Sequence, residues 1–94
     1  MTTMINALPL GMEFDFHGNI RYQKSWYQVY ECLDTTDPFS YGHTKVLFES
    51  DNLGQAHSYA YNTWLEDESK AYTIIQPYDE SCRGGYGDWV EQGE

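Results

Sequence analysis

The sequence predicts an α+β fold in which one main helix packs on a small antiparallel sheet of about four to five strands. Short apolar or alternating segments suit strands, and one longer segment has the three- and four-residue spacing of a helix. The chain of 94 residues has the length of a single domain. Aliphatic residues are scarce, but nine Tyr, four Phe and three Trp supply rings that can fill a core.

A β-hairpin is expected after residues 1–11, which are interpreted as a loose N-terminal lead-in. Residues 12–16 alternate apolar and acidic side chains, which is typical of a half-buried strand, and the alternation resumes at residues 20–22. The residues between them, His17-Gly18-Asn19, suit a turn because Gly and Asn tolerate positive φ. A three-residue loop predicts the cross-strand pairs Phe16–Ile20, Phe14–Tyr22 and Asp15–Arg21.

The segment at residues 26–33 fits either a strand or a helix. Its β-branched and aromatic content favours a strand, whereas its apolar residues also recur at helical spacing. We prefer the strand, because residues 34–38 (Asp-Thr-Thr-Asp-Pro) are typical of a turn that leads into a second strand. A loop at residues 39–43 and a strand at residues 45–49 are expected to follow.

The clearest helix is expected at residues 53–66. Residues 50–52 (Ser-Asp-Asn) are three candidate N-caps, and the apolar residues behind them recur every three or four positions. A strong strand at residues 71–75 follows and ends before Pro77. Residues 78–94 are rich in Gly and acids, and we interpret them as a mobile or loosely docked tail.

The negative charge of the chain is concentrated in its second half. Residues 48–94 hold ten of the fifteen acids but only Lys70 and Arg83 as bases, which leaves −8 of the formal −10. Such a body repels polyanions, which disfavours direct binding to nucleic acid or to anionic membranes. No apolar run approaches the ~20 residues of a membrane span, and the first residues do not resemble a secretory signal. A cytoplasmic protein is therefore expected.

We predict that this charge forms a binding face for a cationic partner. Carboxylates on one face can approximate the field of B-DNA, which presents one phosphate charge per about 1.7 Å of its axis. Charge would steer the encounter and aromatic anchors would fix the pose. The alternative is that the acids confer solubility and the rings only pack. The predicted contact residues are Glu49, Asp51, Glu66, Asp67, Glu68, Asp79, Glu80, Tyr86, Asp88, Trp89 and Glu91, with Tyr59, Tyr61 and Tyr78 as further candidate anchors.

Catalytic and metal-binding motifs are not evident. Cys32, Cys82 and the three histidines lie in no nucleophile motif, and the two thiols are interpreted as reduced cysteines. The acids at 66–68 and 79–80 are consecutive, unlike the alternating ligands of a calcium loop. Residues 84–87 (Gly-Gly-Tyr-Gly) lack the lysine and the strand–helix context of a phosphate loop. No catalytic residue, cofactor or metal is expected, and a small enzyme or metalloprotein is the least favoured hypothesis.

The chain length, the Glu66-Asp67-Glu68 cluster that ends a short helix and the acidic segment from Asp79 resemble small acidic phage proteins directed against bacterial defence. These are proteins of the anti-CRISPR and anti-restriction type. The resemblance implies stoichiometric occlusion of a basic nucleic-acid-binding surface in the host cytoplasm, without turnover. The alternative is a protein–protein adaptor or small phage structural component that binds through an aromatic patch. Edge-strand pairing would allow a homodimer in either case.

Overall fold

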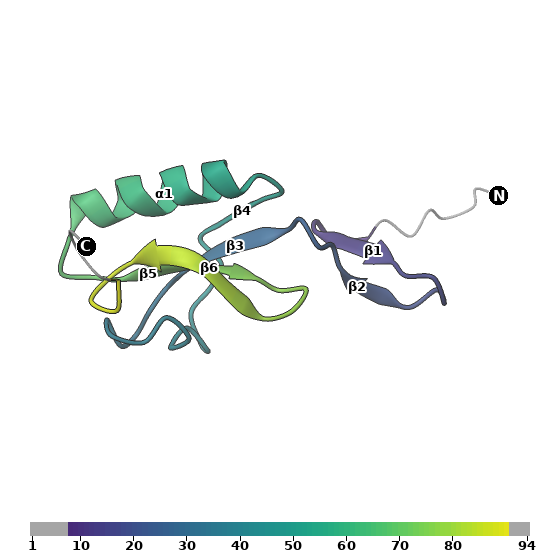
Figure 1. Ribbon diagram of the computed structural model, residues 1–94, viewed down its shortest axis with the longest axis horizontal. Helices are drawn as coiled ribbons and strands as arrows, with labels where there is room; N and C mark the ends of the chain where they lie inside the picture. Colours follow the sequence, from purple (N-terminus) through teal and green to yellow (C-terminus); the bar gives the residue numbers. More distant parts are fainter. Residues whose placement is uncertain (1–7, 91–94) are drawn as a thin grey trace.

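The computed structural model describes residues 8–90 and confirms the α+β fold (Figure 1). Residues 1–7, which make up most of the predicted lead-in, and residues 91–94 lie outside the described part. Four strands precede the helix and two follow it. The elements are β1 (Met12–Phe14), β2 (Ile20–Tyr22), β3 (Tyr27–Glu31), β4 (Phe48–Ser50), α1 (Leu53–Glu66), β5 (Tyr72–Gln76) and β6 (Ser81–Tyr86).

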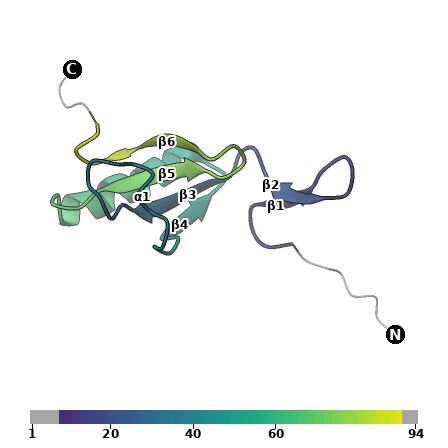
Figure 2. The same cartoon turned by 90° about the horizontal axis from the view of Figure 1, so that it is seen from below.

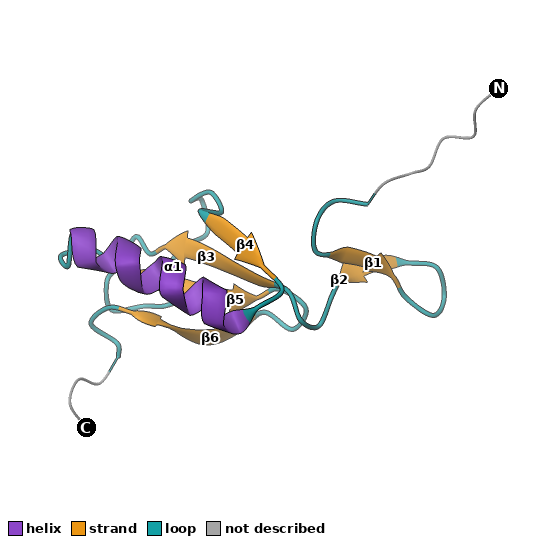
Figure 3. Ribbon diagram, turned by 90° about the horizontal axis from the view of Figure 1, so that it is seen from above, coloured by secondary structure: helices purple, strands orange, loops and turns teal. Residues whose placement is uncertain are grey.

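Four strands form the main antiparallel sheet, in the order β4-β3-β5-β6. Helix α1 packs on one face of this sheet (Figures 1 and 3), and the loop at residues 33–44 runs along the other face (Figures 1 and 2). Strands β1 and β2 form a separate two-stranded sheet that extends away from the rest (Figures 1 and 2). We term residues 8–26 the hairpin arm and residues 27–90 the body.

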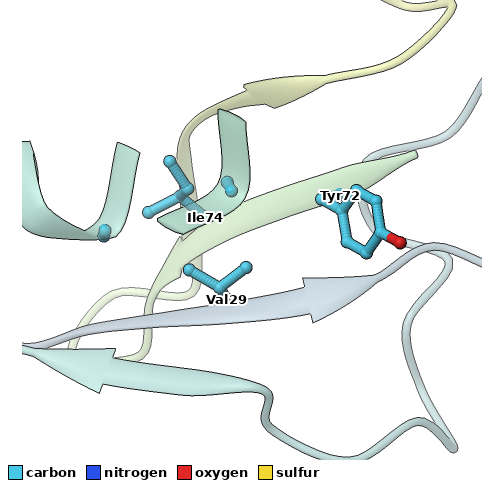
Figure 4. Close-up of a cluster of buried hydrophobic side chains, with 5 residues drawn as sticks. Val29, Tyr72 and Ile74 are labelled. Atoms are coloured by element: carbon cyan, nitrogen blue, oxygen red, sulfur yellow. The ribbon is translucent and has the colours of Figure 1, made fainter. Parts of the chain in front are cut away.

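The core of the body lies between α1 and the sheet. Val29 of β3, Ile74 of β5, and Ala56 and Ala60 of α1 are each 0% exposed, and Tyr72 is 5% exposed (Figure 4). Successive strand side chains point to opposite faces, so every second residue of β3 and β5 faces the helix. The two alanines have no side chain beyond Cβ, and they allow the helix backbone to approach the sheet closely.

Helix α1 spans the predicted residues, Leu53–Glu66. Asn52 caps it, because its side-chain oxygen accepts a hydrogen bond from the Gln55 N–H at 3.1 Å. This bond satisfies one of the backbone donors that the first helical turn leaves without a partner. At the other end the Asp67 N–H donates to the Trp64 carbonyl at 3.1 Å, and the backbone of Asp67 is already extended.

The ambiguous segment at residues 26–33 contains a strand, β3, as preferred from the sequence. The strand expected at residues 45–49 is shorter and lies further along the chain, at Phe48–Ser50. Ser50 explains part of this difference, because it pairs with Tyr27 of β3 instead of capping the helix. The strand predicted at residues 71–75 is shifted by one residue, as β5, and it ends before Pro77 as expected.

The hairpin of β1 and β2 has a register two residues away from the predicted one, because its loop covers residues 15–19 instead of three residues. Asp15 causes the longer loop, since its Oδ1 atom accepts hydrogen bonds from the N–H groups of His17 and Asn19, both at 2.8 Å. This capping makes Asp15 part of the turn. A two-residue shift keeps the side chains of the paired strand residues on their predicted faces. The observed pairs are Met12–Tyr22, Glu13–Arg21 and Phe14–Ile20.

The prediction of a mobile or loosely docked tail at residues 78–94 is wrong for its central part, which forms strand β6. β6 pairs antiparallel with β5 and forms an edge of the main sheet. Its glycines allow close packing: a Cβ on Gly84 would lie 2.6 Å from the His57 ring, and one on Gly85 would lie 2.8 Å from the Trp89 ring. The glycines that suggest flexibility in the sequence therefore provide space for neighbouring rings.

The loop at residues 33–44 closes the sheet face opposite the helix. Tyr41 of this loop stacks on Tyr30 of β3, with ring centroids 4.4 Å apart. Cys32 is buried on the same side of the molecule, and this burial raises the pKa of its thiol to about 11. Cys32 and Cys82 are both free thiols. The thiol of Cys32 therefore stays protonated and poorly reactive near neutral pH.

Candidate acidic binding face

The C-terminal end of α1 and the residues after β6 meet at one end of the body, opposite the hairpin arm (Figure 1). Residues 66–68 (Glu-Asp-Glu) end the helix and begin the next loop, and Asp88 follows β6; all four side chains are exposed. We term Glu66, Asp67, Glu68 and Asp88 the acidic face. A pocket of about 360 Å³ at this face is lined by Trp64, Glu68, Gly87, Asp88 and Val90.

Hydrogen bonds orient two of the four carboxylates. Asp67 accepts bonds from the N–H of Ser69 at 3.1 Å and from its hydroxyl at 2.5 Å. These bonds stabilise the ionised form and hold the pKa of Asp67 below its ordinary value. The N–H of Asp88 donates to the Thr35 carbonyl at 2.9 Å, and the Thr35 hydroxyl donates to the Asp88 carboxylate at 3.2 Å. The loop at residues 33–44 therefore holds Asp88 in place.

An aromatic patch lies beside the acidic face, where α1 packs on β6. The ring of Tyr86 stacks on Trp64 with centroids 5.9 Å apart, and its centroid lies 5.4 Å from that of Tyr61. The Tyr86 hydroxyl lies 3.2 Å from Nδ1 of His57. Burial raises the pKa of Tyr86, whereas Tyr61 is 44% exposed and available to a partner. We term His57, Tyr61, Trp64 and Tyr86 the aromatic patch.

Four other predicted acids do not join the acidic face. Asp51 precedes α1, and Asp79 and Glu80 lie in the turn between β5 and β6, at the end of the body next to the hairpin arm (Figure 1). Glu49 is half-buried on β4 and accepts a hydrogen bond from the Gln28 side chain at 3.2 Å. The 14 residues of α1, about 20 Å in length, separate the two ends. The predicted contact residues therefore fall into two groups.

The remaining predicted contact residues lie at different places in the molecule. Trp89 packs against Gly85 and Gly87, the two neighbours of Tyr86 in the chain. Tyr59 stacks on Phe48 against the core, with ring centroids 4.8 Å apart. Tyr78 lies at the arm end of the body, where two cations of the arm stand 5.4 and 5.7 Å from its ring centroid. Glu91 lies outside the described residues.

The carboxylates of the acidic face are not neutralised by ion pairs within residues 8–90. The one ion pair of this part of the chain joins Arg21 and Glu13 in the hairpin arm, at 2.9 Å. Lys70 attracts Asp67 electrostatically and contributes to its lowered pKa, but the two residues form no ion pair in the described part. The field of the acidic face is therefore directed mainly toward solvent.

Three residues of this surface were not among the predicted contacts: His57, Trp64 and Thr35. The sequence could have indicated His57 and Trp64, because positions 57, 61 and 64 share one side of a helix and Tyr61 was already a candidate anchor. Thr35 had none, because 53 residues separate it from Asp88 along the chain. Only the fold brings this loop residue to the acidic face.

Comparisons with protein-family models, with curated proteins and with solved structures found no significant match. No helix among the described residues is long and apolar enough to cross a membrane. Within residues 8–90, no group of three or more His, Cys, Asp or Glu side chains is arranged to hold a metal ion.

Proposed function

We propose that the protein is a non-enzymatic binding protein that uses the acidic face to occlude a basic, nucleic-acid-binding surface of another protein. Its specific form is a phage-encoded inhibitor of a bacterial defence complex, of the anti-CRISPR or DNA-mimic type, which acts in the host cytoplasm. One observation carries the proposal: Glu68 and Asp88, from two distant chain segments, line one pocket with Trp64 of the aromatic patch. Glu66 and Asp67 adjoin Glu68 in the chain, and none of these four exposed carboxylates is in an ion pair within the described residues.

Charge and rings would contribute to binding in different ways. Opposite charges steer the encounter and set its salt dependence, whereas buried aromatic anchors supply much of the binding energy. Trp64 links the two surfaces, because it stacks on Tyr86 and also lines the pocket with Glu68 and Asp88. A partner that covers the pocket therefore contacts carboxylates and rings together.

The pocket beside Trp64 suits a cationic side chain of the partner. An indole face attracts a guanidinium or ammonium group by about 0.5–2 kcal/mol. Glu68 and Asp88 bring carboxylates to the same pocket from two different segments. Arginine combines a planar face for the ring with a fork of donors for carboxylates, and it is abundant on surfaces that bind phosphate. We therefore expect an arginine of the partner to enter this pocket.

Capture from a bacterial lysate at low and at high salt tests the proposal. Tagged protein retains its partners on a resin, duplex DNA is added as a competitor, and mass spectrometry identifies what is retained and what is released. We expect nucleic-acid-binding proteins that both DNA and salt release, because exposed charges are screened beyond about 8–10 Å at physiological ionic strength.

Two pairs of substitutions distinguish the effect of the acidic face on binding from the effect of net charge. Glu66→Gln with Glu68→Gln removes two charges from the acidic face, and Asp51→Asn with Glu80→Gln removes two from the opposite end. We expect the first pair to weaken binding about tenfold, or ~1.4 kcal/mol, and the second pair to change it much less. Capture that resists salt and both pairs of substitutions would contradict the proposal.

An adaptor that binds through the aromatic patch is the second candidate, and the 44% exposure of Tyr61 favours it. In that case Tyr61→Ser should reduce capture more than the two Glu→Gln substitutions, and salt should have little effect. Tyr61 is a better probe than Tyr86, because Tyr86 packs between the strand and helix and its removal would disturb the fold.

A further inference from the structure

The hairpin arm presents an apolar face that becomes more exposed toward its tip. Phe14 and Ile20 are cross-strand partners next to the loop, and they are 55% and 56% exposed. Phe16, within the loop, is 96% exposed. Met12 and Tyr22, the other pair on this face, lie closer to the body and are half-buried.

The contacts between arm and body lie at the base of the arm. The Gln76 side chain donates a hydrogen bond to the Lys24 carbonyl, and Arg21 and Lys24 stand over the ring of Tyr78. Trp26 is buried where arm and body join. These contacts position the arm but do not cover Phe14, Phe16 or Ile20, which keep the exposure given above.

An isolated pair of strands is marginal in water, and three or more strands or a second packed layer are needed for stability. Each strand of the arm has three residues, so the arm cannot build a core from its own side chains. Contiguous exposed apolar groups of this kind mark interaction sites in soluble proteins. A partner layer on this face would supply the missing core.

Charge distinguishes the arm from the body. Residues 8–26 contain two acids and two bases and have no net charge, and Glu13 and Arg21 form an ion pair within the arm. Residues 27–90 contain eleven acids and three bases, which gives −8. Two copies of the chain therefore repel each other body to body, whereas their arms meet without a charge penalty and project away from the bodies (Figure 2).

We propose that the arms of two copies pack face to face through Phe14, Phe16 and Ile20 and form a two-fold symmetric dimer. A two-fold axis brings the same residues together from both copies, and such dimers are the commonest soluble oligomers. The two hairpins then form a four-stranded sandwich with its layers about 10 Å apart. The bodies lie on opposite sides of this contact, and both acidic faces stay free. This inference does not depend on the proposed function.

The exposed area suits a reversible dimer. An aromatic side chain offers about 150–250 Å², so Phe14 and Phe16 together expose roughly 300 Å² per copy at the exposures given above. Ile20, which is 56% exposed, brings the total for two copies to roughly 800 Å². This is below the ~1,000 Å² of a stable specific interface, so the dimer should be weak and form only at high protein concentration.

Sedimentation velocity over a concentration series tests the proposal. We expect the parent chain to shift from monomer to dimer, and Phe14→Thr with Ile20→Thr to weaken association at least about tenfold. Threonine keeps the strand preference, and circular dichroism verifies that the body is folded. Phe16→Ser is an independent variant, because Phe16 lies in the loop and its removal cannot break strand pairing; it should also weaken association.

A matched variant controls for general loss of apolar surface. Leu33→Ser with Phe39→Ser removes two side chains of the body that are 69% and 53% exposed, and it should leave association unchanged. An equal effect of the body variant would overturn the proposal. A monomer at every concentration would also overturn it, and would leave the apolar face to a different protein.

Salt distinguishes the dimer from binding through the acidic face. Salt screens the repulsion between two bodies of −8, so association of the arms should tighten as salt rises. Capture through the acidic face should weaken under the same conditions. A dimer that dissociates with rising salt would show an electrostatic contact and would overturn the apolar one proposed here.

Discussion

The hairpin arm and the body use similar residues, but the body covers them and the arm does not. In the body, α1 and the loop at residues 33–44 close the two faces of the sheet, and Val29 and Ile74 are 0% exposed. In the arm, Phe14 and Ile20 share a face and are more than half exposed. Alternation in a sequence therefore specifies which residues share a strand face, but not which element covers that face.

The same comparison separates two candidate interaction surfaces, the hairpin arm and the acidic face, along the molecule. The neutral arm lies at one end, and the acidic face lies at the other, with α1 between them (Figure 1). Contact at one end therefore leaves the other end accessible. The predictions below test whether the two regions are as different in stability as they are in exposure.

The largest contrast is expected from one substitution made in both regions. Ile74→Ala removes a fully buried side chain and should lower the free energy of unfolding by about 2–5 kcal/mol. Ile20→Ala removes a side chain that is 56% exposed and should cost less than about 1 kcal/mol. Urea unfolding followed by circular dichroism measures both. Similar losses would mean that the arm belongs to the same cooperative core.

Thiol reactivity tests how firmly the loop at residues 33–44 closes the body. Cys32 is 3% exposed, and burial raises its pKa from 9.0 to about 11. A shift of this size reduces the thiolate fraction about 100-fold at pH 8, and burial also blocks the reagent. In a Cys82→Ser background, iodoacetamide should therefore modify the native protein at least about 100-fold more slowly than the urea-unfolded protein, as measured by mass spectrometry.

The sign of the pH effect follows from the direction of this shift. A raised pKa means that the unfolded chain loses its proton first, so the contribution of Cys32 to stability is complete below about pH 9. It is lost as the pH rises from about 9 to 11. Rapid alkylation of the native protein at pH 8 would indicate that the loop opens easily, and the body would then be less tightly closed than its exposure suggests.

Two glycines with positive φ give an intermediate contrast. Gly84 in the body has φ +134°, and a Cβ there would lie 2.6 Å from the His57 ring. Gly18 in the arm has φ +84°, and no described heavy atom lies within 4 Å of its Cβ position. Gly84→Ala should therefore cost about 2–3 kcal/mol from strain and overlap together, and Gly18→Ala about 1 kcal/mol from strain alone. Equal costs in thermal unfolding would indicate that the His57 ring moves aside.

The smallest effects are expected at exposed polar contacts. Asn52→Ala removes the N-cap of α1 and should cost about 1 kcal/mol. Glu13→Gln breaks the ion pair of the arm, whose side chains are 42% and 38% exposed, and it should cost less than about 0.5 kcal/mol. A double-mutant cycle with Arg21→Gln measures the pair. A coupling energy well above 1 kcal/mol would show that this ion pair is shielded from solvent.

The sequence predicted the helix best, because several independent signals coincide there. A candidate cap and a helical spacing of apolar residues agree on Leu53–Glu66, although acids at the C-terminal end oppose the helix dipole. Strand β6 was missed because its glycines serve tertiary packing, and the space that His57 and Trp89 require is not visible in a linear sequence. The arm register was missed because the Asp15 side chain competes with strand pairing for the backbone N–H groups.

The candidate face could be predicted only where neighbours in the chain are also neighbours in space. The acids at 66–68 are consecutive, so their common place at the end of α1 could be read from the sequence. Asp88 lies at the same end of the body because β6 runs antiparallel to β5 and ends there. Asp79 precedes β6 and therefore lies at the opposite end of the body. Charge counts along a sequence do not contain this information, since an antiparallel strand places its two ends at opposite sides of the molecule.

The position of β6 in the chain has a consequence for the order of assembly. Synthesis starts at the N-terminus, so the hairpin arm emerges early and β6 follows every other described element. Before β6 has formed, Trp64 and His57 lack Tyr86 as a packing partner, and the acidic residues at the helix end lack Asp88. A growing chain would therefore complete the arm before the proposed binding face, and the proposed pairing of arms could precede any binding through that face.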